Sequence, residues 1–142
     1  MLISATGVIT GFSLTPAQGS EREAVWDLVS SIRGLLIGDQ GYLSAPLQHD
    51  RRQVGIQLET AWRSNRHDSR DPVWVALRKR LRRLVETVIG QLVERFSIEK
   101  VRARDLWHLT SRINRKLLAH TVCRWLNRLS PHPLQFEQLV SA

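Results

Sequence analysis

Two carboxylates, Asp39 and Glu86, are the residues of this sequence whose type and setting could do chemistry. Asp39 directly follows the apolar run Leu35-Leu36-Ile37-Gly38, and Glu86 lies in the middle of a long arginine-rich segment. Mg²⁺ prefers oxygen ligands, and carboxylates that hold two such ions can support displacement at a phosphate. The two acids in their basic surroundings therefore predict a metal-dependent phosphoryl-transfer site that acts on nucleic acid.

Two predicted elements place these carboxylates. The apolar run before Asp39 predicts a short buried strand, which would put Asp39 at the C-terminal edge of a sheet, where open α/β folds bind their ligands. Asp71-Pro72 predicts the N-cap and first residue of the longest helix in the chain. Glu86 lies about 140° from the centre of the apolar stripe of that helix, so we expect its side chain outside the core. The stripe comprises Trp74, Leu77, Leu81, Leu84, Val85, Val88, Leu92 and Phe96.

The rest of the pattern predicts an alternation of strands and helices. Residues 2–5 and 8–14 flank Thr6-Gly7 and predict an antiparallel hairpin. A capping box at Ser20 and Glu23 predicts a helix that ends at Gly34, so the order strand, helix, strand indicates a right-handed crossover to a parallel neighbour. Three further elements are expected: a helix over residues 44–54, a strand over residues 56–60 and a last helix over residues 105–126.

The residues around both carboxylates resemble the DDE-type transposases of bacterial insertion sequences, whose catalytic core has the ribonuclease H-like fold. In that family the second catalytic acid is a strand-end Asp followed by x-Gly-Tyr, which Asp39-Gln40-Gly41-Tyr42 matches. The third is a helical Glu with an Arg four residues before it, which Glu86 and Arg82 match. The resemblance runs from about residue 7 to residue 128, and it also includes Thr15-Pro16-Ala17, Glu21-Arg22-Glu23-Ala24 and residues 100–109.

The resemblance implies an α/β fold, a ribonuclease H-like mixed sheet with flanking helices and a C-terminal helical segment. It also implies that Asp39 and Glu86 are catalytic residues and ligands of two Mg²⁺ ions. The family's first catalytic Asp lies on the first strand of the sheet, and no residue before Asp27 could supply it. We therefore expect residues 1–128 to be the C-terminal part of a transposase catalytic domain without its first strand, and residues 129–142 to be a tail. Lys79, Gln18 and Gln40 also depart from the family, which commonly has Tyr, Asn and Lys there.

The function implied by this resemblance is DNA cleavage and strand transfer in transposition. The expected partners are the ends of the insertion sequence and the target DNA, with a second copy of the chain or an upstream transposase segment as a further partner. One alternative is a basic remnant that binds DNA without catalysis. Another is a structural helical protein with a charged surface.

The charge of the chain is concentrated in its second half. The net charge is +8, and residues 1–60 carry −2 whereas residues 61–142 carry +10. Such asymmetry favours a polyanion, because neutralised phosphates release counterions; the alternative is a solvated helix face. Arg82 could contact phosphate, hold Glu86 in place, or form a plain i, i+4 ion pair with it. The candidates for phosphate contact are Arg63, Arg66, Lys79, Arg82, Arg83, Lys100, Arg102, Arg104, Arg115 and Lys116.

The cysteine content and the apolar runs of the sequence indicate where the protein is located. A single cysteine, Cys123, allows no internal disulfide, no apolar run approaches the roughly 20 residues of a membrane span, and a secretory signal is not recognisable. These features predict a cytoplasmic protein without a membrane segment. The five histidines show no metal-ligand spacing. Trp107 and Trp125 are predicted to be core residues of the last helix, and Trp62 is the candidate for base stacking.

Overall fold

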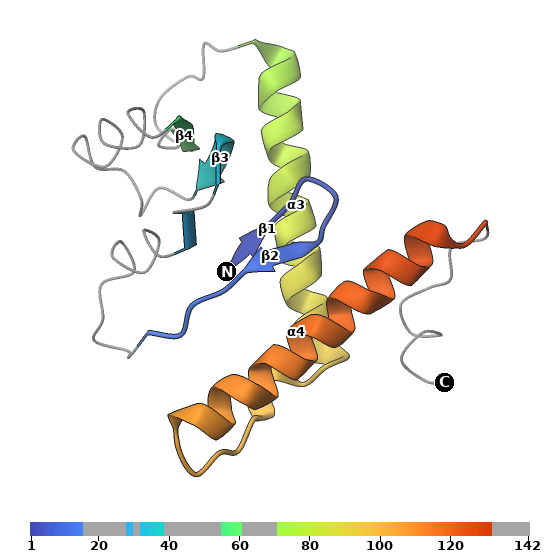
Figure 1. Cartoon of the computed structure of the whole chain (residues 1–142). Coiled ribbons are helices and arrows are strands. Elements are labelled where there is room, and N and C mark those ends of the chain that lie inside the picture. The colour runs from blue at the N-terminus through green and yellow to red at the C-terminus, as the bar shows by residue number, and fades with distance from the viewer. Residues whose placement is uncertain (16–27, 30–31, 39–54, 61–70, 132–142) are drawn as a thin grey trace. The chain divides into compact units, whose positions relative to one another are not determined.

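The computed structural model describes residues 1–15, 28–29, 32–38, 55–60 and 71–131, and its elements form a mixed α/β chain (Figure 1). The chain divides into two compact units, residues 1–12 with 80–142 and residues 13–79, and helix α3 contributes to both. The elements are β1 (Leu2–Ile3), β2 (Ile9–Gly11), β3 (Gly34–Gly38), β4 (Ile56–Thr60), α3 (Pro72–Glu94), the 3-10 helix η2 (Ile98–Lys100) and α4 (Leu106–Leu129).

The N-terminal hairpin confirms the sequence prediction, although its strands are shorter than expected. β1 and β2 pair antiparallel, and the Ser4 N–H donates to the Val8 carbonyl at 2.8 Å to close the turn. Gly7 has a φ of +80°, and a Cβ at this position would collide with the guanidinium of Arg124. The positive φ therefore favours glycine in this turn, and the absence of a side chain leaves room for the Arg124 guanidinium.

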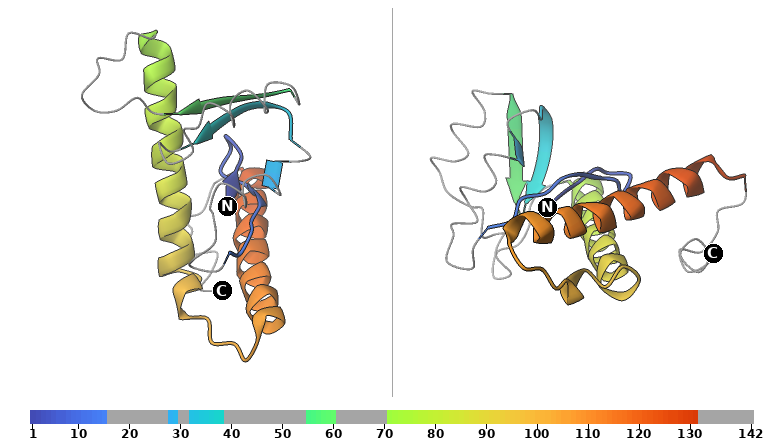
Figure 2. Two further views of the ribbon diagram at one scale, coloured as in Figure 1. Left: turned by 90° about the vertical axis from the view of Figure 1, so that its left-hand side faces the viewer. Right: turned by 60° about the horizontal axis from the view of Figure 1, so that its bottom comes forward.

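The core of the first unit lies between the hairpin, the C-terminal half of α3 and α4. Val88 and Leu92 of α3 and Leu117 of α4 are its buried apolar residues. Figures 1 and 2 show the hairpin lying against both helices. The partly buried residues around this core are Ile3, Ile9, Phe12, Phe96, Ile98 and Ile113.

An aspartate caps the N-terminus of each long helix: Asp71 as the sequence predicts, and Asp105, which was predicted as about the first residue of the last helix. The Val73 N–H donates to Asp71 Oδ1 at 2.7 Å before α3, and the His108 N–H donates to Asp105 Oδ1 at 2.9 Å before α4. The predicted order of lengths is wrong, because α4 has 24 residues and α3 has 23. The α4 helix continues three residues beyond the predicted end at Leu126, since its first interrupting proline is Pro131.

The second unit contains a pair of parallel strands. β3 and β4 are in register from Gly34 opposite Ile56 to Gly38 opposite Thr60, and Ile56 is buried. The long connection through residues 39–55 has the length that a parallel pairing requires. β3 ends at Gly38, one residue short of the predicted end at Asp39. The prediction that this strand is buried is wrong, because none of its five residues is buried and Leu35 is 49% exposed.

The crossover pattern predicted that β3 is parallel to the strand before it, which is β2 of the hairpin. The observed pairing is different. In the described part of the chain β3 pairs with β4, and the hairpin strands pair with each other in a separate two-stranded sheet. Of the helix predicted to precede β3, Leu28 and Val29 are described and are helical. The helix predicted over residues 44–54 lies outside the described residues.

Candidate active site on helix α3

Glu86 lies on the solvent-facing side of α3, one turn after Arg82. Its side chain is 62% exposed, and Arg82 Nε donates to Glu86 Oε1 at 3.1 Å. On the opposite side of the same turns, Val88 and Leu92 are buried in the core. The predicted exposure of Glu86 is therefore confirmed. The predicted apolar stripe is confirmed only in part, because Leu77 and Val85 are exposed.

The exposed side of α3 near Glu86 is basic. Lys79, Arg82 and Arg83 are all exposed, and the Thr87 hydroxyl donates to the Arg83 carbonyl at 2.9 Å, which directs this short side chain back to the helix backbone. At Gly90, one turn beyond Glu86, an added Cβ would meet no other part of the described chain within 4 Å. A carboxylate, three cations and open space thus lie along successive turns of one helix.

Several predicted site residues lie outside the described residues. Asp39, Arg63 and Arg66 are among them, as is Trp62. The predicted approach of Asp39 and Glu86 to roughly 4–8 Å, set by the spacing of two shared metal ions, therefore stays a prediction.

The second group of predicted DNA contacts lies around η2 and α4. Lys100, Arg102, Arg104 and Arg115 are exposed, which suits contact with phosphates. Lys116 differs, because its ammonium donates to the Phe96 carbonyl just after α3 and its side chain is partly buried. This lysine joins the two helices of the first unit, a structural role that the charge pattern did not reveal.

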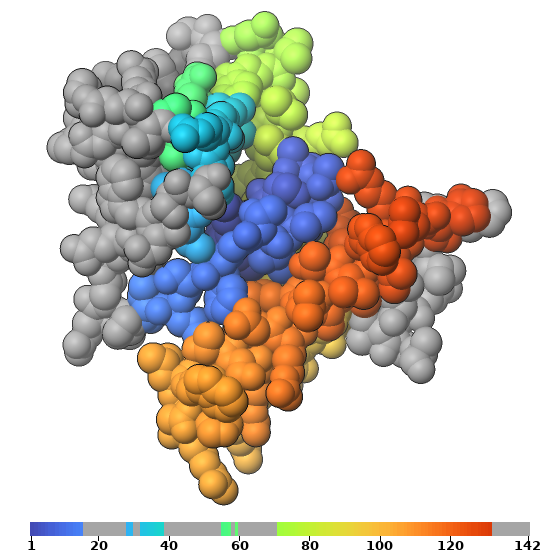
Figure 3. All heavy atoms as spheres, viewed as in Figure 1, coloured from blue at the N-terminus to red at the C-terminus, as the bar shows by residue number. Residues whose placement is uncertain are grey.

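The predicted burial of two tryptophans in α4 is wrong. Trp107 is 73% exposed and Trp125 is 58% exposed. α4 turns Ile113, Leu117 and His120 toward the core, and the tryptophans lie on its other side. On the face that Figure 3 presents, α4 is exposed along much of its length. Its outward side also carries the exposed apolar residues Leu118, Val122, Leu126 and Leu129.

Two histidines take part in arrangements that the spacing of histidines did not predict. His120 is fully buried, and its Nε2 lies 3.0 Å from Gln91 Oε1 on α3. Desolvation by burial, and then the charge of Arg124, lower the pKa of His120 to about 4, so the imidazole is neutral at pH 7. His108 is exposed, and its Nδ1 contacts both oxygens of Asp105, at 2.9 and 2.8 Å.

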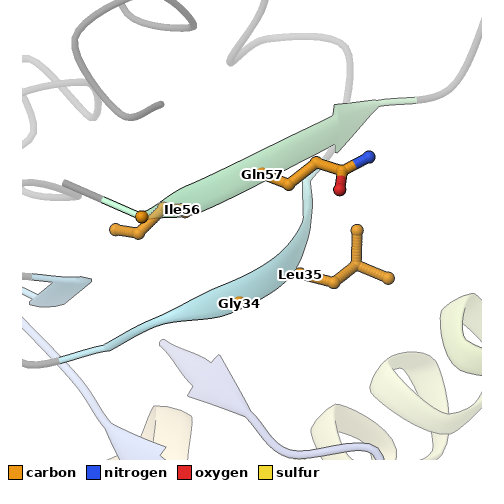
Figure 4. A pocket seen from close by; sticks show the side chains of 5 residues that line it. Gly34, Leu35, Ile56 and Gln57 are labelled. Carbon is orange, nitrogen blue, oxygen red and sulfur yellow. The ribbon is translucent and has the colours of Figure 1, made fainter. Parts of the chain in front are cut away.

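A shallow groove of about 460 Å³ lies in the second unit where β3 and β4 begin (Figure 4). It is lined by Gly34, Leu35, Gly55, Ile56 and Gln57. The amide of Gln57 donates to Glu59 Oε1 at 3.2 Å. The groove lies at the start of two parallel strands, whereas Asp39 follows the carboxyl end, where such sheets bind ligands. It is therefore no part of the candidate site.

The donor chemistry of the candidate site suits Mg²⁺. Glu86 offers an exposed carboxylate, and the proposed second ligand, Asp39, offers another. Within the part of the chain that the structure describes, no three acidic, histidine or cysteine side chains are grouped closely enough to hold a metal ion. Of the two predicted metal ligands, the structure describes Glu86 alone.

The comparison with protein families identifies the class of this chain. Residues 1–106 of its 142 residues match the family described as the transposase DDE domain, and the chain belongs to that family. No curated protein and no solved structure gave a significant match. Transposases of this family act on DNA and generally use a divalent metal ion. The matched residues include both candidate carboxylates.

Among the described helices, none combines the length and the apolar character that a membrane span requires.

Proposed function

We propose that this chain is part of an insertion-sequence transposase, an enzyme of metal-dependent DNA cleavage and strand transfer, and that its catalytic elements have a ribonuclease H-like arrangement. Asp39 and Glu86 are the proposed catalytic carboxylates. The observation that carries the proposal is the setting of Glu86, which is exposed on a basic helix inside the region that matches the transposase DDE domain. This exposure leaves the Glu86 carboxylate accessible to a metal ion and to DNA.

Each residue of the proposed site has a distinct role. Asp39 and Glu86 would hold Mg²⁺, which when bound activates the attacking oxygen and stabilises the leaving oxygen of the displaced phosphate. Arg82 holds the Glu86 carboxylate at 3.1 Å and so sets its orientation before metal binds. Lys79 and Arg83 are exposed on the same helix and would bind the phosphates on either side of the reacting one.

The remaining parts of the proposal concern the extent and partners of the chain. Residues 1–128 would form the catalytic part and residues 129–142 a tail. The DNA partners would be the insertion-sequence ends and the target. The chain would assemble with a second copy of itself or with an upstream transposase segment, and such a segment, which bears the first catalytic Asp, would complete the site.

We expect DNA binding by this chain to be largely independent of sequence and strongly dependent on salt. If about four of the exposed cations contact phosphates, affinity should fall about 100-fold between roughly 50 and 200 mM salt. Fluorescence anisotropy with two unrelated duplexes measures this. The double variant Arg102→Gln/Arg104→Gln should make the slope of log affinity against log salt shallower, by the contribution of about two phosphate contacts. Glu94→Gln, an exposed control on α3, should leave this slope unchanged. Affinity that does not change with salt would refute the electrostatic interface.

We expect the purified chain with Mg²⁺ or Mn²⁺ to bind DNA without nicking it. Asp39 and Glu86 supply two acids, and two metal ions are poorly fixed without a third ligand that bridges them. A plasmid nicking assay measures this, and addition of a segment that carries the family's first Asp should restore cleavage. Metal-dependent nicking that Glu86→Ala abolishes would show that another residue of this chain completes the site. If DNA binding survives and neither metal binding nor complementation is seen, the chain is instead a DNA-binding remnant.

A further inference from the structure

An exposed indole lies at the N-terminal turn of α4, next to a basic segment. Trp107 is 73% exposed, although aromatic side chains usually contribute much of the buried apolar surface of a core. The family match ends at residue 106, so it assigns no role to this side chain. An indole that stabilises no core is available for a ligand.

Contacts within the first turn of α4 hold this indole in place. Its ring meets the His108 ring edge to face, with centroids 4.9 Å apart and planes at 87°. His108 Nδ1 in turn lies within 2.9 Å of both Asp105 oxygens, and the same carboxylate accepts the His108 N–H. The hydrogen bond from the His108 backbone N–H, and then the one from its side chain, lower the pKa of Asp105 and so favour the charged carboxylate. The aromatic pair is therefore oriented before any ligand arrives, which reduces the entropy lost on binding.

The chain just before Trp107 supplies cations. Lys100, Arg102 and Arg104 are exposed, against the two acids Glu99 and Asp105. The Arg112 guanidinium donates to the Arg102 carbonyl, which ties this segment to α4. A fixed aromatic ring beside a row of cations is the combination with which proteins bind single-stranded nucleic acid.

We propose that Trp107 stacks an unpaired DNA base, while Lys100, Arg102 and Arg104 bind the neighbouring phosphates. The ligand is a single-stranded or locally opened segment, because the bases of an intact duplex stack on one another and offer no free face. This inference rests on the proposed DNA function and deepens it: besides the duplex, the chain binds unpaired nucleotides at the start of α4. Trp125 lies further along α4, among the exposed apolar residues Leu118, Val122 and Leu129, and has no such row of cations before it.

Trp107→Ala should weaken binding of a fluorescein-labelled oligothymidylate about tenfold, because one base–aromatic stack is lost. It should leave the affinity for a blunt duplex unchanged. Trp107→Phe should retain most of the oligothymidylate affinity, since phenylalanine still offers a ring. Trp125→Ala is the matched control, an equally drastic change of an exposed tryptophan on the same helix, and should affect neither DNA.

The outcomes separate this inference from the proposed function. Full oligothymidylate affinity in Trp107→Ala, equal losses on both DNAs, or an equal loss in Trp125→Ala would overturn the stacking site. In these cases duplex binding by the unaltered chain still supports the DNA function. If the unaltered chain binds neither DNA, both the inference and the proposed function fail. Circular dichroism of each variant checks that the fold is retained, which the exposure of Trp107 leads us to expect.

Discussion

Leu92→Ala should lower the free energy of unfolding by about 2–5 kcal/mol. Leu92 is 2% exposed and packs with Val88 and Leu117 in the core that joins α3 to the hairpin and α4. Removing its isobutyl group loses the transfer free energy of the buried atoms and leaves a cavity that helices fixed on both sides cannot fully close. Urea unfolding followed by circular dichroism measures the effect.

The matched control for this substitution is Leu118→Ala. Leu118 is 64% exposed on the outer side of α4, next to the buried Leu117. The same chemical change should there alter stability by about 0.5 kcal/mol or less. Similar losses in the two variants would mean that Leu118 is covered in solution or that Leu92 is not in the core. Because α3 carries Glu86, a loosened Leu92 variant should also bind Mn²⁺ more weakly.

Acidification from pH 6.5 to pH 4 should destabilise the fold by up to about 3 kcal/mol through His120 alone. The pKa of His120 is lowered to about 4 in the folded chain, so between pH 4 and 6.5 the unfolded chain binds more protons. Stability from this residue is therefore complete above pH 6.5 and is lost as pH falls toward 4. A charged imidazole would have to leave its buried position beside Gln91 and Arg124.

The measurement is the pH dependence of urea unfolding for the unaltered chain and for His120→Gln. Glutamine can keep a hydrogen bond to Gln91 but does not titrate, so the variant should show a flatter profile between pH 6.5 and 4. Carboxylates titrate in the same range in both proteins, and the comparison removes their contribution. Parallel profiles would contradict a buried neutral His120.

The elements that carry Glu86 could be predicted because their signals are local. Asp71-Pro72 marks the start of α3, and the 3.6-residue spacing of its apolar residues correctly places Val88 and Leu92 inside and Glu86 outside. The end of β3 within one residue of Asp39 follows from the apolar run and the following turn residues. The hairpin likewise follows from Thr6-Gly7 and its flanking residues.

The features that the sequence did not predict depend on contacts between distant residues. His120 is neutral because it is buried against Gln91, and Arg124 reaches the Thr6 carbonyl at 2.6 Å from the far end of the chain. The tryptophans were misplaced because α4 is apolar on two sides, and periodicity alone cannot tell which side meets the core. The side that packs is set by α3 and the hairpin, which no local pattern in α4 encodes.

The central proposal is that Asp39 and Glu86 hold the same metal ions, and Mn²⁺ affinity tests it most directly. Electron paramagnetic resonance of Mn²⁺ would be recorded for the unaltered chain, Asp39→Asn, Glu86→Gln, the double variant and the exposed control Glu94→Gln. Each site variant should weaken binding at least about tenfold, because loss of a ligand should cost no less than the roughly 10–100-fold that loss of an outer-shell partner costs, and the control should not.

The double variant decides the outcome. Because both carboxylates serve one site, the double variant should bind Mn²⁺ little more weakly than either single variant, which is a strong departure from additivity. Losses that add independently, or a Glu86→Gln variant that binds Mn²⁺ as the unaltered chain does, would contradict a shared metal site.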